Sequence, residues 1–336
     1  MMQKRTSQTI KNMAILTSGG DAPGMNAVIK ACVTGALAQN YQVIGYKHGY
    51  NGLINQESLT LDYEKVHNII QLGGTILKSA RCPSMLTEQG LIQAVNTLKK
   101  DNIDALVVIG GDGSFRGMLA LSEKWHGQLI GIPGTIDNDV AGSDYTIGFA
   151  TAIDTALSAI DKIRDTADAF DRIFIVELMG KHSGHLAFHV GLASSAEEVI
   201  SFENFAQDDE TEYLKSLANK IIDHQSFQPG SFIICIAENL WPQGVHALVD
   251  ILKNNYNIDA TACILGHIQR GGSPVANDRI LATKLGHAAI DAIRDNKRNI
   301  MLGEICNQII QTPIADAINN KKHIAENILQ TYLKTH

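Results

Sequence analysis

The sequence has no apolar run that approaches the roughly 20 residues needed to cross a membrane. Its five cysteines are scattered without CxxC spacing, so neither a zinc site nor a disulfide framework is indicated. Residues 1–12 are polar and lack the apolar core of a secretory signal. These absences favour a cytoplasmic protein that starts with a short polar extension.

Basic residues are also in short supply. The 336-residue chain has 28 Lys and Arg against 35 Asp and Glu, and the formal charge of −7 argues against nucleic acid as a partner. Hydrophobic residues make up 45% of the chain and charged residues 19%, which is typical of a globular protein. The length exceeds one compact core of ordinary size and predicts two domains.

Two apolar, strand-like runs lead into turns rich in glycine. The run 13–17 precedes Ser18-Gly19-Gly20-Asp21, and the run 103–109 precedes Gly110-Gly111-Asp112-Gly113-Ser114. Glycines after a buried parallel strand let backbone N–H groups approach phosphate oxygens closely. We expect a helix from Phe115. Asp112 is then placed to bind Mg²⁺, which usually takes one or two carboxylates plus substrate phosphates.

A third junction follows the run 129–132. Thr135, Asp137 and Asp139 occupy alternate positions there, so all three side chains are expected at the carboxyl end of a strand, where open parallel sheets bind ligands. Two carboxylates this close are costly unless they bind a cation or share chemistry. Turn or N-cap formation would suit a lone Asp better than this stretch.

Strand-like and helical runs alternate along the chain, which is the βαβ pattern of a doubly wound parallel sheet. A single Gly-rich turn is weak evidence for a phosphate site, but three such junctions on one sheet are a strong prediction of one. The expected strands are 13–17, 43–46, 103–109, 129–132, 173–178, 198–202, 232–237 and 262–265, and the principal helices are 87–100, 116–124, 147–164, 185–193, 210–224 and 275–294.

Four segments resemble the ATP-dependent 6-phosphofructokinases of bacterial type: LTSGGDAPGMNAVIK, LVVIGGDGSF, PGTIDND with DYTIGF, and LGHIQRGGSPVANDRILA. The resemblance implies two doubly wound α/β domains with mostly parallel sheets and the active site in the cleft between them. The ATP- and Mg-binding domain would comprise 13–148 and about 269–319. The sugar-phosphate domain would comprise about 149–268 and 320–336.

The resemblance also implies an activity: phosphoryl transfer from Mg-ATP to the 1-hydroxyl of fructose 6-phosphate, giving fructose 1,6-bisphosphate in glycolysis. Asp137 would be the general base, Asp112 the metal ligand and Asp139 a support for the cation. ATP would be bound by Gly20, Arg81, Cys82, Gly111, Asp112, Gly113 and Ser114. The phosphosugar would be bound by Thr135, Asp137, Asp139, Arg172, Met179, Gly180, Lys181, Glu238, His267 and Arg270, of which Thr135 and Lys181 are also counted as catalytic.

Arg172 matches an arginine that reaches the sugar phosphate of a neighbouring subunit, so the resemblance implies self-association, with a homotetramer as the family norm. An effector site for ADP or phosphoenolpyruvate is also implied between subunits. Arginines usual at that site are replaced here, as at Lys30, although Arg164 and Glu197 remain. We therefore expect a weak effector response or none.

Three further positions depart from the family pattern, because Lys181, Thr261 and Leu86 stand where arginine is usual. Arg and Lys are not equivalent at bidentate phosphate sites. The departures leave two alternatives open: an ATP-dependent kinase of sedoheptulose 7-phosphate or tagatose 6-phosphate, and a non-catalytic subunit that binds a sugar phosphate. A pyrophosphate-dependent enzyme is disfavoured, because such relatives typically replace Gly113 with Asp and Gly134 with Lys.

Overall fold

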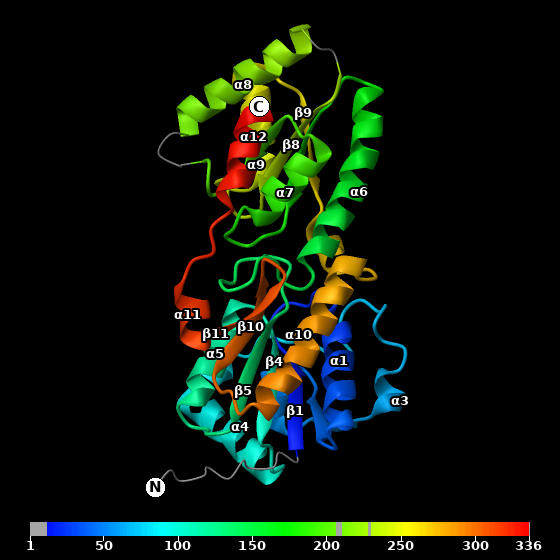
Figure 1. Ribbon diagram of the computed structural model, residues 1–336. Helices are drawn as coiled ribbons and strands as arrows, with labels where there is room; N and C mark the ends of the chain where they lie inside the picture. The colour runs from blue at the N-terminus through cyan, green and yellow to red at the C-terminus, as the bar shows by residue number, and fades with distance from the viewer. Residues whose placement is uncertain (1–11, 206–209, 228–229, 336) are drawn as a thin grey trace. The chain divides into compact units, whose positions relative to one another are not determined.

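The computed structural model describes residues 12–205, 210–227 and 230–335, so the expected polar extension lies outside the described residues except for Asn12. The chain forms two compact units (Figure 1). Within the described residues, unit 1 comprises 12–135, 139–150 and 270–322, and unit 2 comprises 136–138, 151–269 and 323–335. Among the helices in these ranges, none has the length and apolar character of a membrane span.

Unit 1 is built on a seven-stranded sheet with the order β11-β10-β5-β4-β1-β2-β3. The five inner strands run parallel, and β3 and β11 are antiparallel at the two edges. Every residue of β4 and β5 is buried, which explains why their sequences are apolar apart from Gln128. The strands are β1 (Asn12–Thr17), β2 (Gln42–Tyr46), β3 (Ser58–Leu61), β4 (Ala105–Gly110), β5 (Gln128–Pro133), β10 (Ile300–Ile305) and β11 (Gln308–Pro313).

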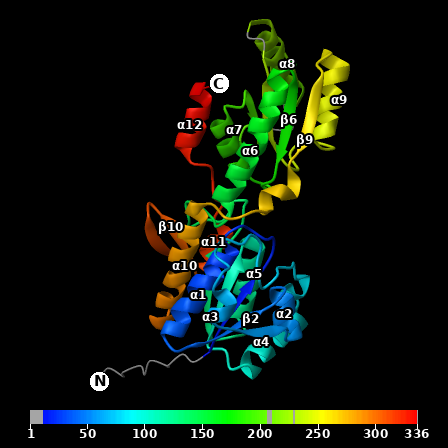
Figure 2. The same cartoon turned by 90° about the vertical axis from the view of Figure 1, so that its right-hand side faces the viewer.

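Helices cover both faces of this sheet. On one face α1 and α10 lie side by side (Figures 1 and 2), with α3 beside α1. On the other face the alternate strand residues Leu16 and Val108 join a core with α2, α4, α5 and α11. These helices are α1 (Met25–Ala38), α2 (Tyr50–Asn55), α3 (Tyr63–Val66), α4 (Glu88–Lys100), α5 (Asp112–Ser122), α10 (Ala276–Arg294) and α11 (Ile314–Asn319).

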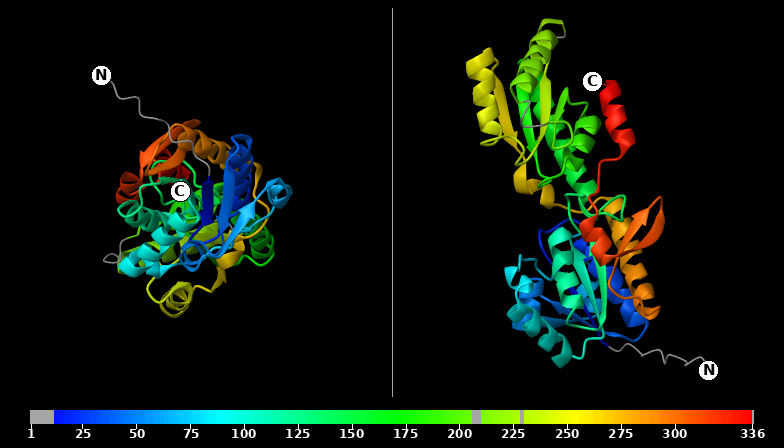
Figure 3. Two further views of the ribbon diagram at one scale, coloured as in Figure 1. Left: turned by 90° about the horizontal axis from the view of Figure 1, so that it is seen from below. Right: turned by 90° about the vertical axis from the view of Figure 1, so that its left-hand side faces the viewer.

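Unit 2 contains a four-stranded parallel sheet with the order β7-β8-β6-β9. Helix α9 packs on β6 and β9, whereas α7 packs on β7 and β8, and α12, drawn in red in Figure 3, packs on α7. The strands are β6 (Ile173–Leu178), β7 (Glu198–Ile200), β8 (Phe232–Ala237) and β9 (Ala260–Ile264). The helices are α6 (Phe149–Asp168), α7 (His185–Ser194), α8 (Glu210–Phe227), α9 (Val245–Tyr256) and α12 (Glu326–Thr335), with a 3-10 turn η3 at Gly266–Arg270.

The predicted α/β class and its mostly parallel sheets are confirmed, and every expected strand is present. The sequence did not predict the β10–β11 hairpin, the edge strand β3, or helices α2, α3, α9, α11 and α12. Strand β7 ends at Ile200, earlier than expected.

Candidate functional site

In unit 1 the loops after β1 and β4 lie side by side. The sheet reverses its winding here, because β2 and β4 flank β1 on opposite sides, and ligands bind at such a point. The Ser18 N–H donates to Ile109 O over 2.9 Å, and the Ser114 hydroxyl donates to Ser18 O over 3.0 Å. A Cβ at Gly110 would lie 2.4 Å from Ser114 Oγ and 2.5 Å from Ser18 O, so only glycine permits this approach.

Helix α5 begins at Asp112, three residues before the expected start at Phe115. The expectation of a loop over these residues was wrong: Gly111 is the N-cap, and the Asp112–Ser114 segment is the first turn. Amide groups of a first turn lack intrahelical acceptors and attract anions. Gly113 is exposed, and a Cβ there would meet nothing within 4 Å. The correction places the expected phosphate-binding residues at a helix N-terminus.

The Asp112 carboxylate lies at this N-terminus and accepts a bond of 3.0 Å from Arg116 Nε. The two side chains are 28% and 54% exposed, and solvent screens a pair this open. Within the described ranges, no group of three or more His, Cys, Asp or Glu side chains is arranged to hold a metal ion. A single carboxylate beside amides that attract phosphates fits the Mg²⁺ mode in which one carboxylate acts together with substrate phosphates.

Thr135 is buried against the same helix N-terminus. A Cβ at Gly111 would lie 3.4 Å from Thr135 Cβ, and the Thr146 hydroxyl donates to Thr135 O over 2.6 Å. Gly134, one residue earlier, is closely packed, because a Cβ there would lie 2.9 Å from the Ile109 side chain. The segment after β5 therefore lies against the segment after β4 within unit 1.

Asp139 has a cationic neighbour that the sequence analysis missed. Lys322 Nζ donates to Asp144 O over 2.8 Å, and burial lowers the Lys322 pKa to about 8, although Asp144 and Asp139 act in the opposite direction. An ammonium that is still mainly protonated at neutral pH therefore compensates the Asp139 and Asp144 carboxylates. No sequence motif marks Lys322, which precedes α12.

Arg270, expected to bind the sugar phosphate, lies along the loop that carries Gly20. Its Nη1 donates to Asp21 O over 3.1 Å, and a Cβ at Gly20 would lie 2.5 Å from that nitrogen. The structure therefore brings Arg270 to the loop that was expected to bind ATP. A guanidinium beside a loop of backbone amides is a favourable place for a phosphate.

Arg81 and Cys82 belong to a segment that runs beside the first loop. The Gly19 N–H donates to Ala80 O over 3.2 Å, and the Ser79 hydroxyl donates to Gly19 O over 2.7 Å. The Arg81 side chain is exposed. Burial raises the pKa of the Cys82 thiol, which stays protonated at neutral pH and is no nucleophile.

In unit 2 the segment Met179–Ser183 follows β6 and forms a tight loop. Glu238, which follows the neighbouring strand β8, accepts through one carboxylate oxygen from the N–H groups of Gly180 at 3.2 Å and Lys181 at 2.8 Å. The Ser183 hydroxyl donates to the backbone oxygen of Asp137 over 3.0 Å. Asp137, 8% exposed, therefore lies with the expected sugar-binding loop.

Glu238 has an acidic neighbour in Glu177 near the end of β6. Burial raises the Glu177 pKa, the Glu238 charge raises it further, and His246 opposes the shift. His267 is exposed in η3, and Leu265 just before η3 donates its N–H to Glu177 O over 3.1 Å. The residues after β6, β8 and β9 thus lie together at the carboxyl ends of these parallel strands.

Arg172 lies at the opposite end of the parallel strands, the amino end. It precedes the first residue of β6, while Met179 follows the last, so about 20 Å of strand separates them. The Arg172 guanidinium stacks 4.6 Å from the ring centroid of Phe170. Thr261 is at the same end, because it pairs with Phe174. Arg172 and Thr261 therefore do not join the Met179 loop of their own chain.

Comparisons with known proteins show which family this chain belongs to. A model of the phosphofructokinase family matches residues 12–293. The chain belongs to the phosphofructokinase family. It is 44% identical to ATP-dependent 6-phosphofructokinase 1 of Thermus thermophilus over 321 residues, which cover 96% of this chain and 98% of the relative. It is 45% identical to ATP-dependent 6-phosphofructokinase 2 of Bacteroides thetaiotaomicron over 323 residues, which cover 96% and 97%.

A solved structure of phosphofructokinase from Saccharomyces cerevisiae aligns with a TM-score of 0.86 at 31% identity. The alignment covers 92% of this chain and 45% of the yeast chain, so this phosphofructokinase spans less than half of that larger relative. The individual site residues remain predictions, and the contacts above show which of them the fold brings together.

Proposed function

We propose that this protein transfers the γ-phosphoryl group of ATP to the 1-hydroxyl of fructose 6-phosphate, giving fructose 1,6-bisphosphate. The observation that carries the proposal is the convergence of both Gly-rich junctions, the α5 N-terminus and Thr135 in unit 1. Relatives named ATP-dependent 6-phosphofructokinase match nearly their full length. A glycolytic reaction of this kind belongs in the cytoplasm, and this location is part of the proposal.

In this proposal the α5 N-terminus and the Gly20 loop bind the ATP phosphates, with Arg81 and Arg270 adding positive charge. Phosphoryl transfer depends on alignment and charge neutralisation more than on covalent help. Mg²⁺ held by Asp112 would supply charge neutralisation at the phosphates. The amides of the first turn do the same through fixed dipoles, which need no rearrangement during the reaction.

The phosphosugar is assigned to the Met179–Ser183 loop, with Glu238 and His267 at the carboxyl ends of the neighbouring parallel strands. Asp137 accepts the proton of the 1-hydroxyl as general base. Its carboxylate is held next to this loop by the bond from Ser183 to its backbone oxygen. Thr135 donates to the transferring phosphoryl group, and Asp139 adds negative charge to the cation site.

Self-association is a further part of the proposal. Arg172 and Thr261 lie about 20 and 17 Å along the strand from the Met179 loop of their own chain, too far to reach the same phosphate. Strand β9 pairs only with β6 among the described strands, and its Ile264 is 51% exposed. An open sheet edge flanked by exposed Phe170 is a surface that a second copy would cover. Arg172 of one copy would then serve the sugar phosphate of another, in a homotetramer.

The proposed base is tested by Asp137→Asn. Removing a positioned general base should lower kcat by roughly 10²–10⁴-fold, with little change in KM for ATP. Asp161→Asn, at an exposed position on α6, is the matched control and should keep wild-type kinetics. The measurement is the rate of fructose 1,6-bisphosphate formation. Near-normal kcat in Asp137→Asn would remove this residue from the role of base.

A further inference from the structure

The Met179–Ser183 loop is fixed at successive backbone groups. Glu238 accepts from the amides of Gly180 and Lys181, and the Ser183 N–H donates back to Gly180 O over 3.0 Å. Lys181 has a φ of 60°, a left-handed conformation that residues other than glycine rarely adopt. Such a conformation persists only where surrounding contacts determine it, and strain of this kind gathers at ligand sites.

The first amide of this loop has a different partner. The Met179 N–H donates over 2.9 Å to Oε1 of Gln269, which is fully buried in η3. The Gln269 Nε2 atom is buried and has no hydrogen-bond partner within the part of the chain that the structure describes. Since the donor is a backbone N–H, the accepting atom must be the amide oxygen, which fixes the orientation of the side chain.

A buried amide side chain that uses only its oxygen, as Gln269 does, adds little to the stability of the fold. A buried N–H group without a partner carries a desolvation penalty, and an apolar side chain of the same shape would avoid it. The hydrogen bond that Gln269 accepts from the Met179 N–H holds the start of the sugar-binding loop. No other expected site residue makes this contact, and the sequence analysis passed over Gln269 although it stands between His267 and Arg270.

We propose that Gln269 is a positioning residue for the phosphosugar, acting through its bond to the Met179 amide. This inference rests on the proposed function, because the loop is the assigned sugar site. With Gln269 in place, the loop is held in the binding conformation before the sugar arrives. Without it, only a fraction of molecules has the loop in that conformation, and apparent affinity falls by that fraction.

The test compares substitutions that remove or keep the accepting oxygen. Gln269→Met removes it while preserving length, and also removes the unpartnered Nε2. Gln269→Glu keeps an acceptor in the same place. Loss of one hydrogen bond should raise KM for fructose 6-phosphate about five- to tenfold in Gln269→Met. We expect kcat and KM for ATP to change less than twofold, the melting temperature to change little, and Gln269→Glu to stay within about twofold of the wild-type KM.

The alternatives give different results. If folded Gln269→Met keeps the wild-type KM for the sugar, or if Met and Glu raise it equally, the inference is wrong and Gln269 only fills space. Should Gln269→Met fail to fold, Gln269→Asn repeats the test, because its shorter amide does not reach Met179. A wild-type protein that phosphorylates no fructose 6-phosphate would overturn the proposed function instead, so the two failures are distinguishable.

Discussion

Thr261 is the residue that most affects the choice of sugar. An arginine grips a phosphate through two charge-assisted hydrogen bonds, whereas threonine offers one neutral hydroxyl. The structure adds that Thr261 is exposed near the amino end of β9, the same end of the sheet as Arg172. Both positions therefore belong to the surface assigned to a neighbouring subunit's phosphate. A longer side chain at 261 has room, because the residue faces solvent.

We expect Thr261→Arg to lower KM for fructose 6-phosphate by about one to two orders of magnitude, since a hydrogen bond to a charged group contributes about 1.5–3 kcal/mol. The value of kcat should change little. Thr261→Val is the control, because it removes the hydroxyl without adding charge, and should leave KM unchanged. Steady-state kinetics with all three proteins decide the matter. An unchanged KM in Thr261→Arg would favour the alternative activity, an ATP-dependent kinase of sedoheptulose 7-phosphate or tagatose 6-phosphate.

Glu177 gives a pH-dependent prediction at the carboxyl end of β6. Burial and the Glu238 charge raise its pKa in the folded state, so its protonated form favours folding. That contribution is complete below the unfolded-state pKa and is lost as the pH rises through the raised folded-state pKa. Glu177→Gln mimics the protonated form and should therefore raise the melting temperature at pH 7.5.

The benefit of Glu177→Gln should shrink toward pH 4, where the wild-type carboxyl also becomes protonated. Glu212→Gln, at an exposed position on α8, provides the comparison and should have little effect at either pH. Thermal unfolding of the three proteins at both pH values is the measurement. An equal benefit at pH 4 and 7.5, or a loss of stability at pH 7.5, would contradict the assignment.

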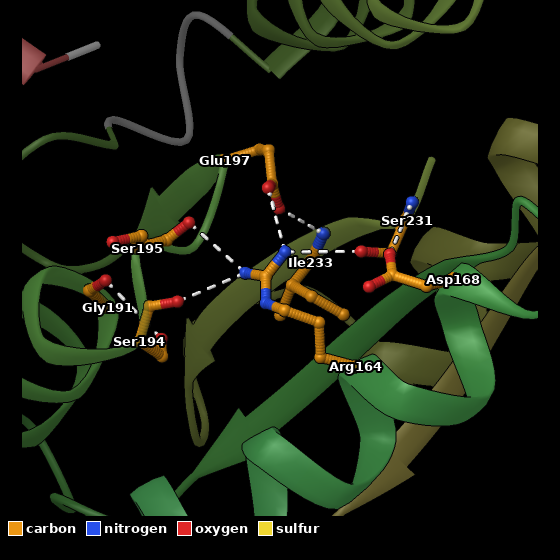
Figure 4. A network of polar contacts seen from close by, with 8 residues as sticks. All are labelled: Arg164, Asp168, Gly191, Ser194, Ser195, Glu197, Ser231 and Ile233. Carbon is orange, nitrogen blue, oxygen red and sulfur yellow. Dashed lines mark hydrogen bonds and ion pairs between the residues drawn. The ribbon is translucent and has the colours of Figure 1, made fainter. Parts of the chain in front are cut away.

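At the scale of elements, Arg164 connects helix α6 to the sheet of unit 2 (Figure 4). Its Nη1 donates to Glu197 Oε1 at 3.0 Å and to Ser231 Oγ at 3.2 Å, and its Nη2 donates to the backbone oxygens of Ser194 and Ser195, both at 3.1 Å. Glu197 also accepts from Ile233 N–H in β8 at 2.6 Å. The guanidinium is thus committed to internal partners, which supports the expectation of a weak effector response.

Arg164→Met should therefore lower the free energy of unfolding by about 2 kcal/mol, because it leaves the Glu197 carboxylate and two carbonyls with fewer donors. The same substitution at Arg294, whose ion pair with Asp291 is more than half exposed, should change stability by less than about 0.5 kcal/mol. Urea unfolding compares the two. Equal effects would show that Arg164 contributes no more than a surface arginine.

The elements also show what the sequence could predict. Strands β4 and β5 were predictable because they are buried on both faces and have continuous apolar sequences. The β10–β11 hairpin was not, because its two-residue turn is Cys306-Asn307. Both residues have positive φ, 49° and 61°, without the glycine that marks such turns.

The candidate site also has residues that the sequence could predict and residues that it could not. The Gly-rich junctions were predictable because backbone approach demands glycine, as at Gly110. Gln269 and Lys322 were not, because a single amide or amine has no pattern, and its role depends on partners distant in sequence. The start of α5 was missed because glycines at 111 and 113 lower helix propensity, while the tertiary contact of Ser114 with Ser18 overrides it.

For the whole molecule, the central claim is the identity of the phosphoryl donor and acceptor. Gly113 leaves open space at the α5 N-terminus and adds no negative side chain there. Phosphate groups therefore meet neither a bulky nor an anionic side chain at this position. The most direct test is a panel in which fructose 6-phosphate, sedoheptulose 7-phosphate and tagatose 6-phosphate are each offered with Mg-ATP or with Mg-pyrophosphate. We predict that kcat/KM is highest for fructose 6-phosphate with ATP and that pyrophosphate is not used. Comparable turnover with pyrophosphate, or at least tenfold better kinetics with another sugar, would contradict the account.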